Sequence, residues 1–382
     1  MKRPHFEPEH EEFRRSVRAF ARERLAPHHL EWEEQRIVPR SVFTDAGRGG
    51  FIGTAVPLEY GGGGVRDFRF NQILSEELFD AGLGGSGLGL TLHNDVTMPY
   101  FIKYSSDEQK ARWLPGIASG KLITAIAMTE PGAGSDLAGM STTARRDVSE
   151  YIVNGSKTFI TNGINADLVI VATVTDPDAG RSGMTLLVVE RGMQGFDRGR
   201  KLDKIGLHAQ DTAELFFNDV RVPASNRLGE EGAAFGYLTS SLAQERLSIA
   251  VAGVASARAA LRLTVEYVTT RRAFGKRIAD FQNTKFVLAE VKTEIDVAQA
   301  YLDQCVVALN SGELTGDEAA AAKWWCTELQ RRATDRCLQL FGGYGYMMEY
   351  PIARAYLDAR VTTIYGGTTE IMKTIISKSM GL

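Results

Sequence analysis

The chain of 382 residues contains very little cysteine. Cys305, Cys326 and Cys337 form no C-x-x-C pair, and the six histidines are scattered without an H-E-x-x-H motif. A disulfide framework needs paired cysteines, and a zinc or iron site needs closely spaced cysteine or histidine ligands. We therefore predict no metal site, and we interpret the cysteines as reduced packing residues of a cytoplasmic protein.

Long apolar runs and charge of one sign are also missing. No run of about twenty uncharged apolar residues, the length that spans a bilayer, occurs in the chain. The start, MKRPHFEPEHEEF, lacks the apolar core of a signal peptide and is too acidic for a mitochondrial transit peptide. Lys plus Arg number 44 against 47 Asp plus Glu, a net charge of -3 without long blocks of either sign. We expect no membrane span and no nucleic-acid partner.

Apolar spacing predicts that the first third of the chain is helical. Apolar side chains recur on one helical face in residues 9–24 and 70–79, and S-D-E-Q at residues 106–109 is a typical helix start. Gly82, Gly84 and Gly87 fit the dinucleotide-binding pattern G-x-G-x-x-G, but a helical segment precedes them where that motif requires a strand. We therefore reject a dinucleotide-binding loop here.

The periodicity changes after Ala125. Asn154-Gly155 lies between two short β-type runs and predicts a hairpin turn. Further β-rich runs cover residues 168–174, 184–190 and 214–222, with turn residues between them. Short strands at this spacing predict a β-barrel or sandwich of about a hundred residues.

The helical period returns from Gly236 onward. Residues 249–261 are apolar on most sides, which is typical of a buried helix, and Thr315 with Glu318 forms a capping-box pattern. The predicted fold class is α+β multidomain, with an N-terminal helical domain (1–122), a middle β-barrel or sandwich (123–226) and a C-terminal four-helix-bundle domain (227–382).

Four places in the chain are candidates for chemistry. Residues 125–136, AIAMTEPGAGSD, form a glycine-containing turn whose backbone N–H groups could lie against a planar ligand, or an ordinary surface turn. Arg271 is either a phosphate clamp or a surface charge at a helix end, and the glycines of residues 339–343 permit close approach or simply stop a helix. Glu245 begins an otherwise apolar helix, where the helix macrodipole is the simpler explanation.

Six ordered motifs together resemble the acyl-CoA dehydrogenase family from about Glu9 to the end of the chain. They read AMTEPGAGSD, SKTFITNG, ELFFNDVRVP, RRAFGK, QLFGGYGY and IYGGTTEIMK. QDTAELFF, AQERL and EYPIARAYLDAR further resemble the long-chain members of that family. The helical, β, helical order agrees with the family architecture.

The resemblance implies an FAD cofactor and a set of binding residues. The implied substrate-binding residues are Ser135, Gln244, Arg246 and Gly367. Ser135 is also counted among the implied cofactor-binding residues, which are Met128, Thr129, Gly134, Ser135, Phe159, Ile160, Thr161, Arg271, Phe274, Gln282, Gln339, Leu340, Gly342, Gly343, Thr368, Thr369 and Glu370. Arg271 and Gln282 would hold the FAD of a neighbouring subunit, so at least a dimer, and by family habit a homotetramer, is implied.

The catalytic base departs from the commonest family pattern. Many members carry a glutamate where this chain has Gly366, and glycine cannot accept a proton. The long-chain and isovaleryl-specific members carry a glutamate before an arginine earlier in the chain, and Glu245-Arg246 matches that arrangement. The resemblance therefore assigns Glu245 as the base, with the backbone N–H of Gly366 donating to the thioester oxygen.

The implied activity is α,β-dehydrogenation of a medium-to-long or branched acyl-CoA to trans-2-enoyl-CoA. Electrons would pass to an electron-transferring flavoprotein, as in the family. Two alternatives stay open: a flavin oxidase or monooxygenase of the same fold, and a non-catalytic acyl-CoA-binding protein.

Overall fold

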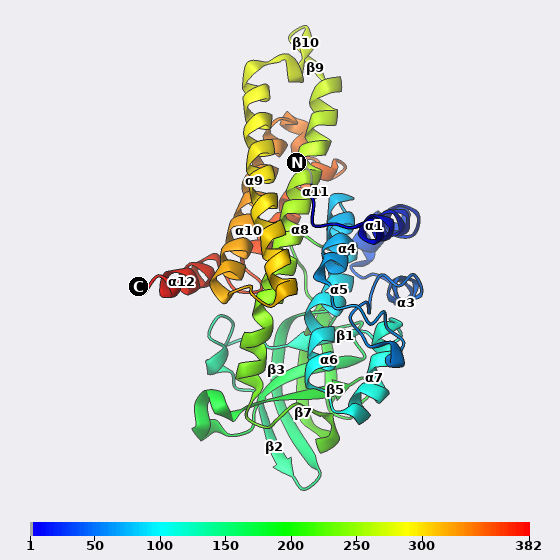
Figure 1. Ribbon diagram of the computed structural model, residues 1–382, viewed down its shortest axis with the longest axis vertical. Coiled ribbons are helices and arrows are strands. Elements are labelled where there is room, and N and C mark those ends of the chain that lie inside the picture. Colours follow the sequence, from blue (N-terminus) through cyan, green and yellow to red (C-terminus); the bar gives the residue numbers. More distant parts are fainter. Residues whose placement is uncertain (1–2) are drawn as a thin grey trace.

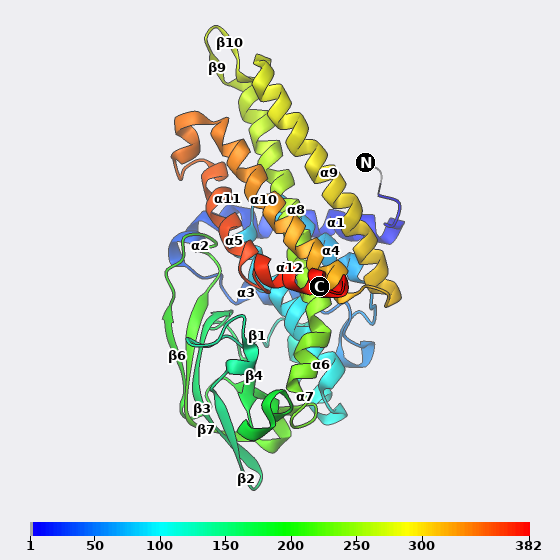
Figure 2. The same ribbon diagram turned by 90° about the vertical axis from the view of Figure 1, so that its left-hand side faces the viewer.

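The computed structural model describes residues 3–382 (Figure 1). A bundle of long helices forms one end of the molecule's long axis and a β-sheet forms the other, in both views (Figures 1 and 2). The N-terminal helices lie beside both parts. The predicted order of helical, β and helical regions is confirmed.

The N-terminal region consists of helices joined by short turns. They are α1 (Pro8–Phe20), α2 (His29–Gln35), α3 (Ser41–Arg48), α4 (Phe68–Asp80), α5 (Gly84–Thr91), α6 (Met98–Tyr104) and α7 (Asp107–Ala118). The expected helix start at residues 106–109 is confirmed, and Ser106 and Gln109 form a capping box there. A π-helical segment, Leu92–Thr97, joins α5 to α6. Gly82 and Gly84 follow helix α4, which confirms that they do not form a strand-to-helix nucleotide loop.

The middle region is an eight-stranded sheet. Its strands are β1 (Thr124–Ala127), β2 (Thr143–Asp147), β3 (Glu150–Thr161), β4 (Leu168–Val174), β5 (Met184–Glu190), β6 (Phe196–Lys201), β7 (Thr212–Pro223) and β8 (Arg227–Leu228). The order is β6-β7-β3-β2-β4-β5-β8, with β1 paired parallel to β4. Apolar side chains of both faces are buried, so the sheet has a core on each side.

The predicted hairpin turn at Asn154-Gly155 is wrong. Both residues lie inside β3, where the pairing with β7 shifts register. The side-chain amide of Asn154 donates to Asp219 and its oxygen accepts the Asp219 N–H, each at 2.9 Å, so a residue distant in sequence holds this bulge. The chain reverses instead at Val148, between β2 and β3, with a φ of 54°.

The C-terminal region is a bundle built around one long helix. It contains α8 (Ala234–Thr270), α9 (Gln282–Ser311), α10 (Gly316–Gln339), α11 (Pro351–Ala359) and α12 (Thr369–Ser379), with a hairpin of β9 (Arg272–Ala273) and β10 (Lys276–Arg277) between α8 and α9. Helix α8 is long and apolar enough to cross a bilayer by length and composition alone. Its apolar side chains are buried against α4, α9 and α10, and the three cysteines are buried and unpaired.

Gly155 is a position where only glycine fits the bulge of β3. Its φ is +144°, and an added Cβ would lie 2.8 Å from the Thr142 Cα. Gly155→Ala should therefore destabilise the chain by about 2 kcal/mol and lower its melting temperature by a few degrees in calorimetry. Gly316→Ala is the control, because an added Cβ there meets nothing within 4 Å. Equal melting temperatures for the two variants would contradict this account.

Candidate active site

Glu245 lies well inside α8 and not at its start. The helix begins at Ala234, so Glu245 is about three turns from the N-terminus. The helix dipole acts mainly within the first turn. The macrodipole interpretation of this glutamate is therefore wrong, and its burial needs another explanation.

Glu245 is buried, with 6% of the residue exposed, and Tyr100 of α6 supplies the hydrogen bond to its carboxylate. The Tyr100 hydroxyl donates to Oε1 at 2.9 Å. Burial raises the pKa of Glu245 to about 7, because the Tyr100 hydrogen bond and the Arg246 charge lower it less than desolvation raises it. A carboxyl group with this pKa can accept a proton near neutral pH.

Gly366 lies beside the helix that carries Glu245. Its φ is +63°, and an added Cβ would approach the Ile249 Cδ1 to 2.3 Å. Ile249 is four residues after Glu245 on α8, so the two side chains share one helix face. The tertiary structure thus brings Gly366 next to the face of α8 that holds the carboxylate. A side chain at Gly366 would need both a left-handed backbone and a displaced Ile249.

A buried ion pair anchors the turn at residues 125–136. The Lys157 ammonium of β3 donates to Glu130 Oε1 at 2.8 Å and to the Met128 carbonyl at 3.1 Å. Burial opposes ionisation of Glu130, but the Lys157 and Thr142 hydrogen bonds bring its pKa to about 2. The Thr158 N–H also donates to the Thr129 carbonyl at 2.9 Å. The predicted cofactor-binding residues on the turn therefore lie next to those on β3.

The surface above this turn is open. A Cβ added at Gly132 or Gly134 would meet no atom within 4 Å, and neither glycine has a positive φ. Nearby Phe159 has a φ of +60° and is 67% exposed. A strained backbone that presents an aromatic ring to solvent is typical of a ligand-contacting position. The adjoining Ile160 is buried, and Thr161 is half-buried.

A second group of predicted cofactor contacts lies at the far end of the bundle. Arg271, Phe274 and residues 339–343 line one pocket, where the Arg271 guanidinium lies 5.1 Å from the centre of the Tyr344 ring. No carboxylate of residues 3–382 pairs with Arg271. Phe274, on the β9–β10 hairpin, is 95% exposed with a φ of +51°. Gln282 starts α9 nearby but does not line this pocket.

The two groups are separated within one chain. In both views the β9–β10 hairpin lies at one end of the long axis, whereas the sheet that carries Phe159 lies at the other (Figures 1 and 2). One chain therefore does not gather all the predicted cofactor contacts around one point.

The remaining predicted residues surround the start of α12 and the neighbouring turn of α8. Thr368 caps α12, Thr369 is buried and donates to Glu328, and Glu370 is exposed. The Gln244 amide donates to the Asp95 carbonyl at 2.7 Å. Arg246 is 7% exposed and its Nε has no hydrogen-bond partner among the described residues.

Sequence reasoning missed three buried polar residues of this region. Tyr100 holds Glu245, and the Lys323 ammonium donates to the Gly367 carbonyl at 2.7 Å. Asp95, in the π-helical segment, accepts from Ser248 at 2.6 Å and from Asn71 at 2.7 Å, and burial raises its pKa to about 6. All three act across contacts between distant segments, so no local pattern marks them.

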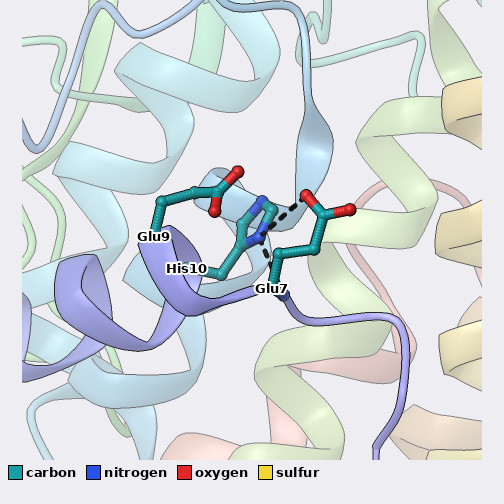
Figure 3. A group of neighbouring side chains, drawn as sticks. All are labelled: Glu7, Glu9 and His10. Carbon is teal, nitrogen blue, oxygen red and sulfur yellow. Dashed lines mark hydrogen bonds and ion pairs between the residues drawn. The ribbon is translucent and has the colours of Figure 1, made fainter.

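Glu7, Glu9 and His10 form a cluster that could be mistaken for a metal site (Figure 3). The His10 Nδ1 accepts the Glu7 N–H at 3.1 Å, and its Nε2 lies 3.2 Å from Asp67 Oδ2. Both ring nitrogens are therefore used by the protein. The cluster is the cap of α1, and we assign no metal to it.

Comparison with known proteins agrees with this architecture along the chain. Family models described as acyl-CoA dehydrogenase N-terminal, middle and C-terminal domains match residues 7–121, 125–220 and 232–381. The mitochondrial long-chain specific acyl-CoA dehydrogenase of Sus scrofa is 49% identical over 377 residues, covering 98% of this chain and 87% of that protein.

Solved structures show the same fold. An acyl-CoA dehydrogenase from Geobacillus kaustophilus superposes with a TM-score of 0.97 at 50% identity, over 100% of both chains. A glutaryl-CoA dehydrogenase from Mycobacterium smegmatis in complex with FADH2 has a TM-score of 0.91 at 29% identity, over 98% of this chain and 95% of that chain.

The raised pKa of Glu245 predicts a pH-dependent cost. Below about pH 4.5 the carboxyl is protonated in both states, and as pH rises through about 7 the folded state must ionise a buried group. This ionisation lowers the free energy of unfolding of the wild type by about 3 kcal/mol, and Glu245→Gln has no such loss. The melting temperature of Glu245→Gln, minus that of the wild type, should therefore rise between pH 5 and pH 8. Glu313→Gln, at an exposed position, should follow the wild type, and parallel curves for Glu245→Gln would contradict the buried-carboxylate account.

Proposed function

This chain belongs to the acyl-CoA dehydrogenase family, and we propose that it oxidises long-chain fatty acyl-CoA to trans-2-enoyl-CoA with Glu245 as its base. The observation that carries the proposal is the buried carboxylate of Glu245, held by Tyr100 beside the Gly366 turn. The long-chain class is supported by the 49% identity to a relative named for that specificity.

Glu245 is suited to remove the α-proton of a thioester. Tyr100 engages Oε1, which leaves Oε2 without a hydrogen-bond partner among residues 3–382. The α-carbon is a weak acid, so the carboxylate has to be ionised yet poorly solvated, and a pKa of about 7 meets both conditions. Glu245 would hold this proton while the β-hydrogen leaves as hydride. The acyl chain then carries a new α,β double bond.

The thioester oxygen gains negative charge as the α-proton leaves, and a donor is needed there. We assign this role to the backbone N–H of Gly366. The absence of a side chain leaves that N–H accessible, since the turn is only half-buried. Arg246 is buried and directly follows Glu245 on α8, and it adds positive charge to this region.

The residues of two regions fit FAD. The open surface above Gly132 and Gly134, with the exposed Phe159 ring, could hold the flavin, together with Met128, Thr129, Ile160 and Thr161. The pocket of Arg271, Phe274 and residues 339–343 offers an unpaired guanidinium for phosphate. When bound, FAD supplies the acceptor for the two electrons that leave with the β-hydrogen.

These two regions imply that FAD lies between two copies of the chain. Within one copy the hairpin and the sheet lie at opposite ends of the molecule (Figure 2). A second copy could bring its Arg271 pocket to the first copy's flavin surface. We therefore propose at least a homodimer, and a homotetramer by family habit. We also propose that an electron-transferring flavoprotein accepts the electrons and that the protein is cytoplasmic. The domain limits that we propose are 1–122, 123–226 and 227–382.

The base assignment predicts a loss of flavin reduction. Anaerobic palmitoyl-CoA should bleach the bound flavin of the wild type, and Glu245→Gln should slow this about 10³-fold while FAD stays bound. Glu313→Gln should react normally. Normal reduction of Glu245→Gln would refute the assignment of the base.

The wild type should also prefer palmitoyl-CoA to butyryl-CoA by about tenfold in kcat/KM, and the opposite preference would refute only the long-chain class.

The shared FAD site predicts complementation between chains. Arg271→Gln removes a two-pronged phosphate donor and should weaken FAD binding by about 10-fold or more, whereas the exposed Arg22→Gln should not. Gly134→Leu should block the flavin surface. Coexpressed Arg271→Gln and Gly134→Leu chains should regain one intact site per mixed pair, measured as bound FAD per chain. A mixture that binds no more FAD than either variant alone would contradict a shared site.

A further inference from the structure

Lys323 of α10 is a buried cation without a carboxylate partner. Its side chain is 0% exposed, and none of the ion pairs among residues 3–382 includes it. Its one hydrogen bond runs from Nζ to the Gly367 carbonyl oxygen, at 2.7 Å. A buried ammonium that contacts only a neutral acceptor destabilises the fold, so stability does not explain the presence of lysine here.

A second buried cation lies close to Lys323. Burial and, to a smaller extent, the positive charge of Arg246 lower the pKa of Lys323 to about 8, against weaker attraction from Glu328 and Glu370. Arg246 itself is buried with an unpartnered Nε. Helices α8 and α10 therefore place two mutually repelling cations beside the Gly366–Gly367 turn. Such an arrangement favours the arrival of negative charge at this place.

The turn itself has little to hold it. Gly366 and Gly367 have φ values of +63° and +98°, and two successive glycines form the least restricted kind of backbone. Before the turn, the Tyr365 N–H donates to the Val361 carbonyl at 3.1 Å. After it, Thr368 caps α12, which packs against α10 (Figure 2). Between these points Lys323 is the one described side chain that hydrogen bonds to the turn's backbone.

We propose that Lys323 is a positioning residue for the thioester oxygen. By holding the Gly367 carbonyl it fixes the turn so that the Gly366 N–H stays directed at that oxygen, and it adds positive charge beside the turn. This inference rests on the proposed acyl-CoA dehydrogenase site. It explains a buried lysine that neither the base nor the predicted FAD contacts require.

The test measures how strongly the bound carbonyl is polarised. FAD-loaded protein is mixed with trans-2-hexadecenoyl-CoA that carries ¹³C at the thioester carbonyl, and the labelled C=O stretch is recorded by isotope-edited infrared spectroscopy. A hydrogen bond to the oxygen lowers this frequency. Binding to the wild type should lower the C=O frequency relative to free ligand. Binding to Lys323→Met should leave most of this lowering absent. The exposed Lys378→Met, which removes the same charge from α12, should keep it.

Kinetics and stability separate positioning from a structural role. Lys323→Met should lower kcat about 10- to 100-fold with KM changed less than about threefold, because the aligned donor matters mainly in the transition state. Its melting temperature should equal or exceed that of the wild type, since methionine has a similar length and no charge to bury. Lys323→Gln keeps a donor and should retain part of the carbonyl shift; it serves as the test if the methionine variant does not fold.

Three results would overturn the inference. An unchanged carbonyl frequency in Lys323→Met, or in Lys323→Gln if only that variant folds, would show that Lys323 does not act on the thioester oxygen. A loss of activity that is matched by a lower melting temperature, without a change in the carbonyl frequency, would show that the role of Lys323 is structural. Failure of the wild type to bind the labelled ligand would instead refute the proposed function and remove the basis of this inference with it.

Discussion

The burial of one carboxylate inside α8 constrains the architecture around the candidate site. Glu245 gains no help from the helix terminus, because α8 begins about three turns earlier. Its single strong partner is the Tyr100 hydroxyl, which α6 delivers from the N-terminal region. The carboxyl group therefore keeps a pKa of about 7 only while the N-terminal helices and the bundle remain packed together. The proposed role of Glu245 as the base therefore depends on an interface between regions that are far apart in sequence.

Missing side chains shape the site as much as those present. At Gly366 a Cβ would meet Ile249, four residues after Glu245, so the turn lies against the face of α8 that carries the carboxylate. The open surface above Gly132 and Gly134 likewise depends on small residues, while the buried Lys157–Glu130 pair below holds the turn. A rigid support beneath an open surface suits a large planar ligand.

The two groups of residues that we propose to bind FAD are separated along the molecule. Phe159 lies on β3 of the sheet and Phe274 on the β9–β10 hairpin, which form opposite ends of the long axis (Figure 1), and each exposed ring presents apolar surface to solvent. Exposure of such rings is costly in an isolated chain and is relieved when a ligand or a second copy covers them. This exposure supports the proposal of an FAD site shared between two copies of the chain.

The sequence by itself determined the helical, β, helical order, the start of α7 and the capping box of α10, because apolar periodicity and helix caps act over a few residues. Its ordered motifs also indicated the family and proposed Glu245 as the base. It failed at Asn154-Gly155, where pairing with Asp219 makes a bulge out of an apparent turn. It could not show Tyr100 or Lys323, since their partners are 145 and 44 residues away. Only the tertiary structure decided these contacts, because desolvation and hydrogen bonding depend on which distant groups the fold buries together.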